Sequence, residues 1–191
     1  TLKGISKISV QTGTTHGGVP LADGTVAKVK IDFEVLQKLS ETARARYGLA
    51  GAVQHGASTL PDEAFDRFPA TQTAEIHLAT GFQNIIYDSK SFPGRLRAKV
   101  YDHLRSELKG EWKEKDTEEQ FIYKTRKKGF GPFKQELWEL PADVRDEICA
   151  ELEGKFAFLF DKLKINGTRQ LLDRFVKPVD VPLERPAALK G

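Results

Sequence analysis

Two histidines stand at positions where they could share a metal ion. His16 and His55 each follow a segment with strand character and each precede a glycine, which lets a ligand approach the backbone closely. A catalytic zinc ion needs about three protein ligands, so at least one ligand must come from elsewhere. The alternative is that each histidine only ends its strand through hydrogen bonds to the backbone. Their recurrence in consecutive units favours contact with a metal or a substrate.

The loop after the second histidine is suited to an anion. Gly56 to Thr59 supplies small and hydroxyl-bearing residues directly before an expected helix, where free N–H groups and the helix dipole favour a phosphate. A similar polar loop is expected from Thr80 and Gly81, after the next strand, which suggests that two loops close on one anion. The competing interpretation, that Ser58 and its neighbour only cap the helix, stays open here. His77 lies inside the expected third strand and fits a core role as well as a functional one.

These residues sit in a pattern of alternating strands and helices. A Thr-x-x-Asp capping box with a proline predicts the second helix, and the other elements follow from periodicity. The expected order is a strand at 8–11, a helix from 32 to 48, a strand at 49–54, a helix at 59–68 and a strand at 74–79. Such an order predicts a parallel sheet with right-handed crossovers, whose ligands bind at the carboxyl ends of the strands.

Beyond residue 92 the pattern becomes helical. Apolar spacing predicts one helix around 100–108 and a long one from 144 to 163, while glycine and proline predict a loop at 127–133. The proline-containing tail from Lys177 should be extended.

Three segments resemble the class II, zinc-dependent fructose-bisphosphate aldolases. Gly13-Thr14-Thr15-His16-Gly17 resembles the family's Gly-Thr-Ser-His-Gly loop. His55-Gly-Ala-Ser-Thr-Leu-Pro-Asp-Glu63 resembles its His-Gly-Gly-Ser-Gly-Val-Pro-Asp-Glu loop. The segment from Glu75 to Gly81 is similar in position to the family's Lys-Val-Asn-Ile-Asp-Thr-Asp. It differs in having His77 for the substrate-binding Asn and Ala79 for the first Asp.

The resemblance implies a set of site residues. His16 and His55 would bind zinc, a monovalent cation would be held near the substrate phosphate, and His77 would be a further substrate contact. The implied phosphate-binding residues are Gly17, Gly56, Ser58 and Thr80. The family's remaining metal ligands and its catalytic carboxylate have no counterpart here, so the resemblance implies a base and a third zinc ligand upstream of this chain.

The resemblance also implies a fold and an activity. We expect the C-terminal part of a TIM (β/α)8 barrel at 1–92, a helical extension packed on the barrel at 93–176, and an extended tail at 177–191. The implied enzyme is a lyase of glycolysis and carbohydrate metabolism that cleaves a ketose bisphosphate such as fructose 1,6-bisphosphate, as a homodimer. His77 and Ala79 motivate two alternatives: a non-catalytic sugar-phosphate-binding barrel, or a related aldolase or isomerase acting on another phosphosugar.

Composition excludes other classes of protein. The 191 residues contain 39% hydrophobic and 30% charged residues, with no apolar run long enough for a membrane span. The net charge of +3 arises where acids alternate with bases, which argues against nucleic-acid binding. The single cysteine, Cys149, fits a reducing cytoplasm and is expected to be buried. The absence of methionine suggests that a segment precedes Thr1.

Overall fold

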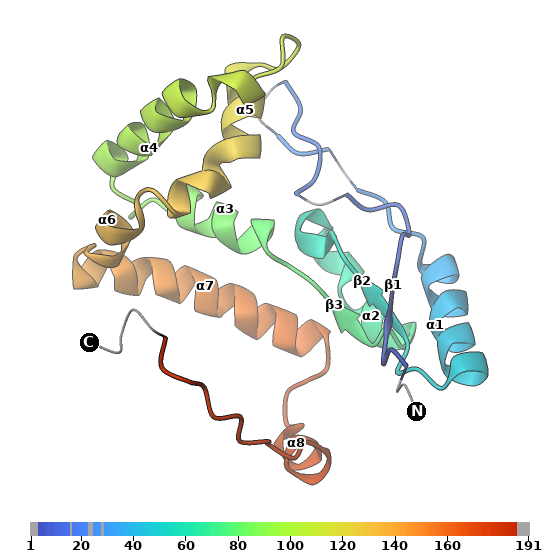
Figure 1. Ribbon diagram of the computed structural model, residues 1–191. Helices are drawn as coiled ribbons and strands as arrows, with labels where there is room; N and C mark the ends of the chain where they lie inside the picture. The colour runs from blue at the N-terminus through green and yellow to red at the C-terminus, as the bar shows by residue number, and fades with distance from the viewer. Residues whose placement is uncertain (1–3, 16, 23–24, 28, 187–191) are drawn as a thin grey trace.

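The computed structural model describes residues 4–15, 17–22, 25–27 and 29–186 and is mixed α/β, mostly helical (Figure 1). Its sheet has three parallel strands in the order β1 (Ile8–Val10), β2 (Ala52–Gln54) and β3 (Glu75–Ile76). Ile8 pairs with Ala52, and Val53 pairs with Glu75. The predicted parallel sheet is therefore confirmed, although every strand is shorter than expected.

Helix α1 (Phe33–Tyr47) joins β1 to β2 and begins and ends as predicted. The Asp32 carboxylate accepts a hydrogen bond from the backbone N–H of Val35 at 3.0 Å, and Gly48 ends the helix in the left-handed conformation. Phe33 and Leu36 lie on its buried face. The amphipathic spacing of the sequence thus gives the crossover helix that a parallel pair requires.

The connection between β2 and β3 differs from the predicted single helix. It consists of 3-10 turns at Ala57–Thr59 and Asp62–Ala64, followed by the short helix α2 (Arg67–Ala70). The predicted capping box is wrong, because the second turn begins after Pro61 without a side-chain cap. Pro61 has no N–H to donate to a capping side chain, and proline favours an extended conformation in the residue before it. The chain therefore forms separate turns here instead of one helix.

The rest of the chain is helical. Helix α3 (Thr80–Asp88) follows β3 almost directly and packs against α7, with the Phe82 and Phe156 rings stacked at 4.6 Å. The remaining helices are α4 (Gly94–Glu107), α5 (Glu118–Thr125), α6 (Lys134–Trp138), α7 (Ala142–Lys162) and α8 (Arg169–Phe175), with 3-10 helices at Lys109–Glu111 and Arg126–Phe130. The predicted loop at 127–133 is therefore wrong in its first half, whereas the predicted long helix is confirmed as α7.

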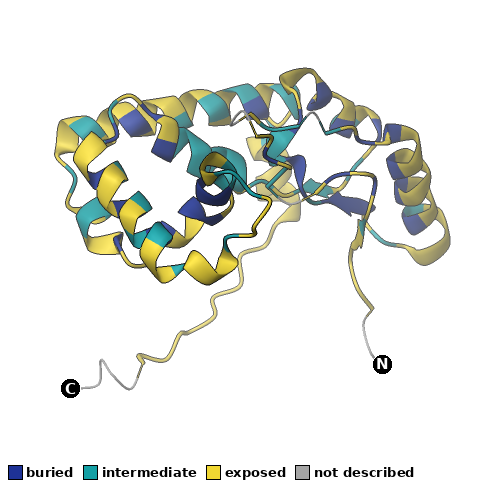
Figure 2. Ribbon diagram, turned by 90° about the horizontal axis from the view of Figure 1, so that it is seen from above, coloured by how far each residue is buried: buried dark blue, intermediate teal, exposed yellow. Residues whose placement is uncertain are grey.

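Two groups of buried side chains stabilise this arrangement (Figure 2). The first surrounds Leu36 and Phe68 beside the sheet, and the second surrounds Tyr87 and Phe121 among the helices. Helix α7 contributes Leu159 to the first group and other residues to the second. The same helix therefore joins the sheet to the helical part, which Figure 1 shows as a rod passing along both.

Some expectations concern the surface. Cys149 is exposed, so the prediction of a buried thiol is wrong: it lies on α7 next to buried Ile148 but is itself accessible to solvent. Residues 177–186 have no helix or strand and are exposed, as expected for the tail. No helix in the described part of the chain is long and apolar enough to cross a membrane.

Candidate functional site

Two histidines meet where β2 and β3 end. The imidazole rings of His55 and His77 are stacked, with their centroids 4.3 Å apart and their planes at 24°. The prediction that His77 lies inside the third strand is wrong, since β3 ends at Ile76. Its backbone N–H still donates to the carbonyl oxygen of Gln54 at 2.9 Å, which continues the strand pairing by one bond. This bond brings the His77 side chain to the same edge of the sheet as His55.

A carboxylate adjoins the histidine pair. Glu75 accepts hydrogen bonds from the Lys7 ammonium and from the His77 imidazole Nε2. The Lys7 hydrogen bond, followed by the His77 hydrogen bond, lowers the pKa of Glu75 below its ordinary value. The Glu75 side chain is 34% exposed, so water screens this charge cluster. This cluster was not predicted, because Lys7 is far from Glu75 and His77 along the chain.

The loop after β1 lies against the loop after β2. His16, the first predicted metal ligand, lies outside the described residues, but Thr15 directly before it is described. Gly56 has φ +71°, and a Cβ placed on it would lie 2.9 Å from the Thr15 carbonyl oxygen and 3.0 Å from the Thr14 hydroxyl. Only glycine fits such an approach without a shift of one loop. The residue before His16 and the residue after His55 are therefore in contact.

A buried polar network fastens these two loops. Gln54, with 1% of its surface exposed, accepts from the Thr12 hydroxyl at 2.5 Å and donates to the Thr14 hydroxyl at 2.8 Å. The Gln54 amide also donates to the His55 carbonyl oxygen at 2.7 Å, as does the Thr14 hydroxyl at 2.7 Å. Sequence reasoning missed this network. The available signal was a glutamine at the end of an apolar strand, a polar type that needs partners when buried.

The predicted phosphate-binding residues fall into two groups. Gly17 and Thr80 face one another, since a Cβ on Gly17 would lie 3.5 Å from the Thr80 hydroxyl, and both line a cavity of about 180 Å³. Gly56 and Ser58 do not line that cavity. The Ser58 hydroxyl instead accepts from the backbone N–H of Ala79 at 2.8 Å. Ser58 therefore positions the entry to α3, and the residues from Thr80 onward form a helix where a loop was predicted.

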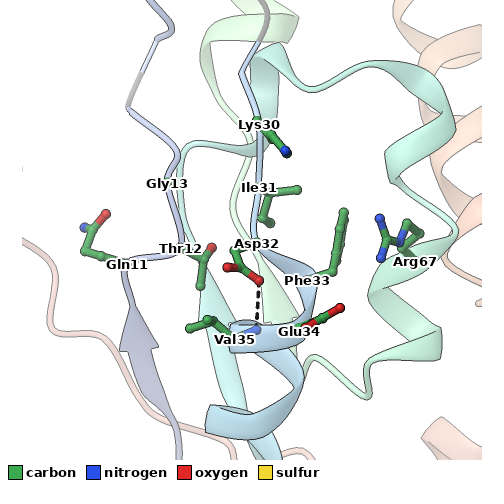
Figure 3. Close-up of a pocket in the computed structure, with 10 residues that line it drawn as sticks. All are labelled: Gln11, Thr12, Gly13, Lys30, Ile31, Asp32, Phe33, Glu34, Val35 and Arg67. Atoms are coloured by element: carbon green, nitrogen blue, oxygen red, sulfur yellow. Dashed lines mark hydrogen bonds between the residues drawn. The ribbon is translucent and has the colours of Figure 1, made fainter.

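A wider cavity of about 700 Å³ lies between the start of the first loop and the beginning of α1 (Figure 3). Its lining includes Thr12, Gly13, Asp32 and Arg67. Asp32 already caps α1, as the dashed line in Figure 3 marks, and the Arg67 guanidinium lies 4.2 Å from the centre of the Phe33 ring. Asp32 and Arg67 thus support the fold, and none of the predicted site residues that the structure describes lines this cavity.

The residue types at the strand ends fit part of a zinc site. Imidazole is a ligand that zinc prefers, and Glu75 and His77 stand beside His55. However, within the ranges that the structure describes, no group of three or more His, Cys, Asp or Glu residues could hold a metal ion. His55 could supply one ligand, and the remaining ligands of the predicted zinc site, His16 among them, lie outside the described residues.

Comparison with known proteins adds no assignment. The chain matches no model of a known protein family, and no curated protein is significantly similar to it.

Proposed function

We propose that this chain is the C-terminal part of a metal-dependent aldolase barrel that cleaves a ketose bisphosphate. One observation supports it above the others: the loops that carry His16 and His55 are bound together at the carboxyl end of a parallel sheet. The loops are held together by the close contact between Thr15 and Gly56 and by the hydrogen bonds of Gln54. We relate this contact to zinc binding because both loops resemble those of class II aldolases.

The open edge of the sheet supports the barrel. Among the described residues β1 pairs only with β2, and an apolar cavity of about 480 Å³ lies beside it. Several apolar residues around this cavity are exposed, including Ile5 at 66%, Ile8 at 41% and Tyr47 at 71%. A further parallel strand with its helix would pair with β1 and bury these side chains. A closed (β/α)8 barrel supplies such a neighbour.

The residues of this chain would bind and orient the substrate. With zinc held by His16, His55 and a ligand from another part of the barrel, the ketone of the substrate would be polarised by a Lewis acid. The Gln54 network fixes the backbone at His55, so the imidazole is held in position before substrate arrives. Gly17 and Thr80 would anchor the phosphate, whose binding energy helps to place the reacting carbon. The base would come from outside this chain.

A second function is a sugar-phosphate-binding barrel without aldol chemistry. The stacking of His77 on His55 favours it, because the ring that replaces the family's asparagine covers one face of the expected zinc ligand. The Nε2 atom of His77 is already bonded to Glu75. This arrangement would bind a phosphosugar without a stoichiometric metal.

Metal content and turnover separate the two functions. The intact protein, which includes the part of the proposed barrel outside this chain, would be analysed for zinc, and cleavage of fructose 1,6-bisphosphate would be followed with and without a chelator. We expect about one zinc per chain, chelator-sensitive cleavage, and loss of both in His55→Ala. His103→Ala is the matched control, since His103 packs edge-on against Phe133 in the helical part. Phosphosugar binding without zinc or turnover would instead establish the second function, and full activity in His55→Ala would refute the first.

A further inference from the structure

The cavity that Gly17 and Thr80 line has a cationic wall. Lys124, Arg126 and Lys127 line it from α5 and the 3-10 helix Arg126–Phe130, and none of the described residues that line it carries a carboxylate. Its volume of about 180 Å³ suits a small group rather than an extended polymer. A cavity with several cations and no acid favours an anionic occupant.

The cations differ in how far they are already neutralised. Arg126 is 7% exposed and binds both carboxylate oxygens of Asp88, at 2.5 and 2.9 Å. Lys124 pairs with Asp116 at 2.7 Å. Lys127 is exposed and has no hydrogen bond or ion pair with the described residues. Lys127 therefore carries the charge that is available to a ligand. The Nε atom of Arg126 is also buried without an acceptor in the described part of the chain.

Hydrogen bonds hold the two walls at a fixed separation. The Tyr123 hydroxyl of α5 donates to the Gly17 carbonyl oxygen at 2.9 Å and accepts from the Asn84 amide of α3 at 3.2 Å. The side-chain oxygen Oδ1 of Asn84 accepts from Arg126 at 2.6 Å. The glycine loop, α3 and the cationic segment are thus joined around the cavity, which is preorganised for a ligand.

The opposite wall supplies hydrogen-bond donors. Thr80 begins α3, and the preceding Ala79 gives the helix no side-chain cap. The N–H groups of the first turn have no partner within the helix, and the Thr80 hydroxyl lies beside them. These donors and the positive end of the helix dipole add to the field of Lys127.

We propose that this cavity is a phosphate subsite in which Lys127 pairs with the phosphate monoester of a small ligand. The identity of that ligand as a phosphosugar rests on the proposed function, whereas the anion preference rests on the cavity itself. The helical part of the chain then contributes directly to binding, through residues that the loop motifs do not include.

Titration calorimetry at low salt tests the subsite with three probes: inorganic phosphate, glycerol 3-phosphate and glycerol. We expect both phosphate-bearing probes to bind and glycerol not to bind. Lys127→Gln should weaken both phosphates about tenfold, equal to about 1.4 kcal/mol. Lys128→Gln is the matched control, because it removes the same charge from the next residue, which pairs with Glu111. This control should change affinity less than about twofold, since Lys128 is not among the residues that line the cavity and its charge is paired with Glu111.

Equal losses in the two variants, or no binding of either phosphate to protein shown by circular dichroism to be folded, would overturn the subsite. Zinc content and turnover of Lys127→Gln separate this proposal from the aldolase proposal. Lys127-dependent phosphate binding in a protein without zinc would support the subsite and refute the aldolase. Zinc-dependent cleavage by the intact protein, with unchanged phosphate affinity in Lys127→Gln, would support the aldolase and refute the subsite.

Discussion

Replacement of Gln54 by methionine should weaken the candidate site through its buried network. Methionine keeps the length of the side chain but removes three hydrogen bonds, one from Thr12 and two to Thr14 and His55. At about 1 kcal/mol each, these bonds account for about 3 kcal/mol, and the Thr12 hydroxyl, 5% exposed as a residue, is left without its acceptor. Burial of the apolar methionine thioether in place of the amide offsets about 1 kcal/mol of this loss in the free energy of unfolding. We therefore expect a net loss of about 2–4 kcal/mol in the free energy of unfolding.

Urea unfolding followed by far-ultraviolet circular dichroism measures this loss. Gln37→Met is the control, because Gln37 lies exposed on α1 and bonds only to Glu41 at 2.9 Å; its effect should be within about 0.5 kcal/mol. Thr12→Val and the double variant complete a cycle, in which the double loss should fall short of the sum by about 1 kcal/mol. A loss below about 0.5 kcal/mol in Gln54→Met, or strict additivity, would show that the network does not hold the loops together.

Three further outcomes are expected. Gly56→Ala should lower the free energy of unfolding by about 2–4 kcal/mol and lower the metal content, because the new Cβ meets the backbone of the first loop. Gly48→Ala is the control: Gly48 has φ +65° but open space around it, so its loss should be about 1 kcal/mol, and urea unfolding compares the two variants. Glu75 has a lowered pKa, so its contribution to stability is complete above the ordinary value of 4.5 and is lost as pH falls through the lower folded-state pKa. Over that pH range the urea midpoint of Glu75→Gln should therefore fall less than the midpoint of the wild-type protein. Equal falls in the two midpoints would contradict this prediction. Burial raises the pKa of Tyr87 to about 12, so the stability of the wild-type protein should fall as pH rises from 10 toward 12, and the stability of Tyr87→Phe should fall less. At neutral pH the stability of Tyr87→Phe should be equal or higher, because the buried hydroxyl that it removes has no hydrogen-bond partner among the described residues.

Local signals predicted the parts of the fold that depend on local physics. The limits of α1 follow from Asp32 at one end and Gly48 at the other, and α7 follows from its apolar spacing. The parallel order of the strands follows from the helix between each pair. In these cases the residues that decide the structure are neighbours in the sequence.

Other features were missed where distant residues decide the structure. The Ser58 hydroxyl binds the N–H of Ala79, which lets α3 start at Thr80 where the sequence alone indicated a loop. The role of Gln54 depends on Thr12 and Thr14, about forty positions earlier. Hydrogen bonds of this kind leave no periodic trace in the sequence, so the contacts that support the candidate site were not predictable from it.

The helical part of the chain takes part in the site rather than only covering the sheet. Its Gln120 amide donates to the carbonyl oxygen of Pro20 at 2.7 Å, and Tyr123 donates to that of Gly17, so α5 holds the loop after β1 at two points. That loop has only a short strand behind it and contains several glycines, and therefore has little stability of its own. The position of the first loop over the carboxyl ends of the strands thus depends on α5 as well as on Gln54. Changes in the packing of α5 should consequently alter ligand binding at the sheet, even though α5 contributes no strand and none of the predicted metal ligands.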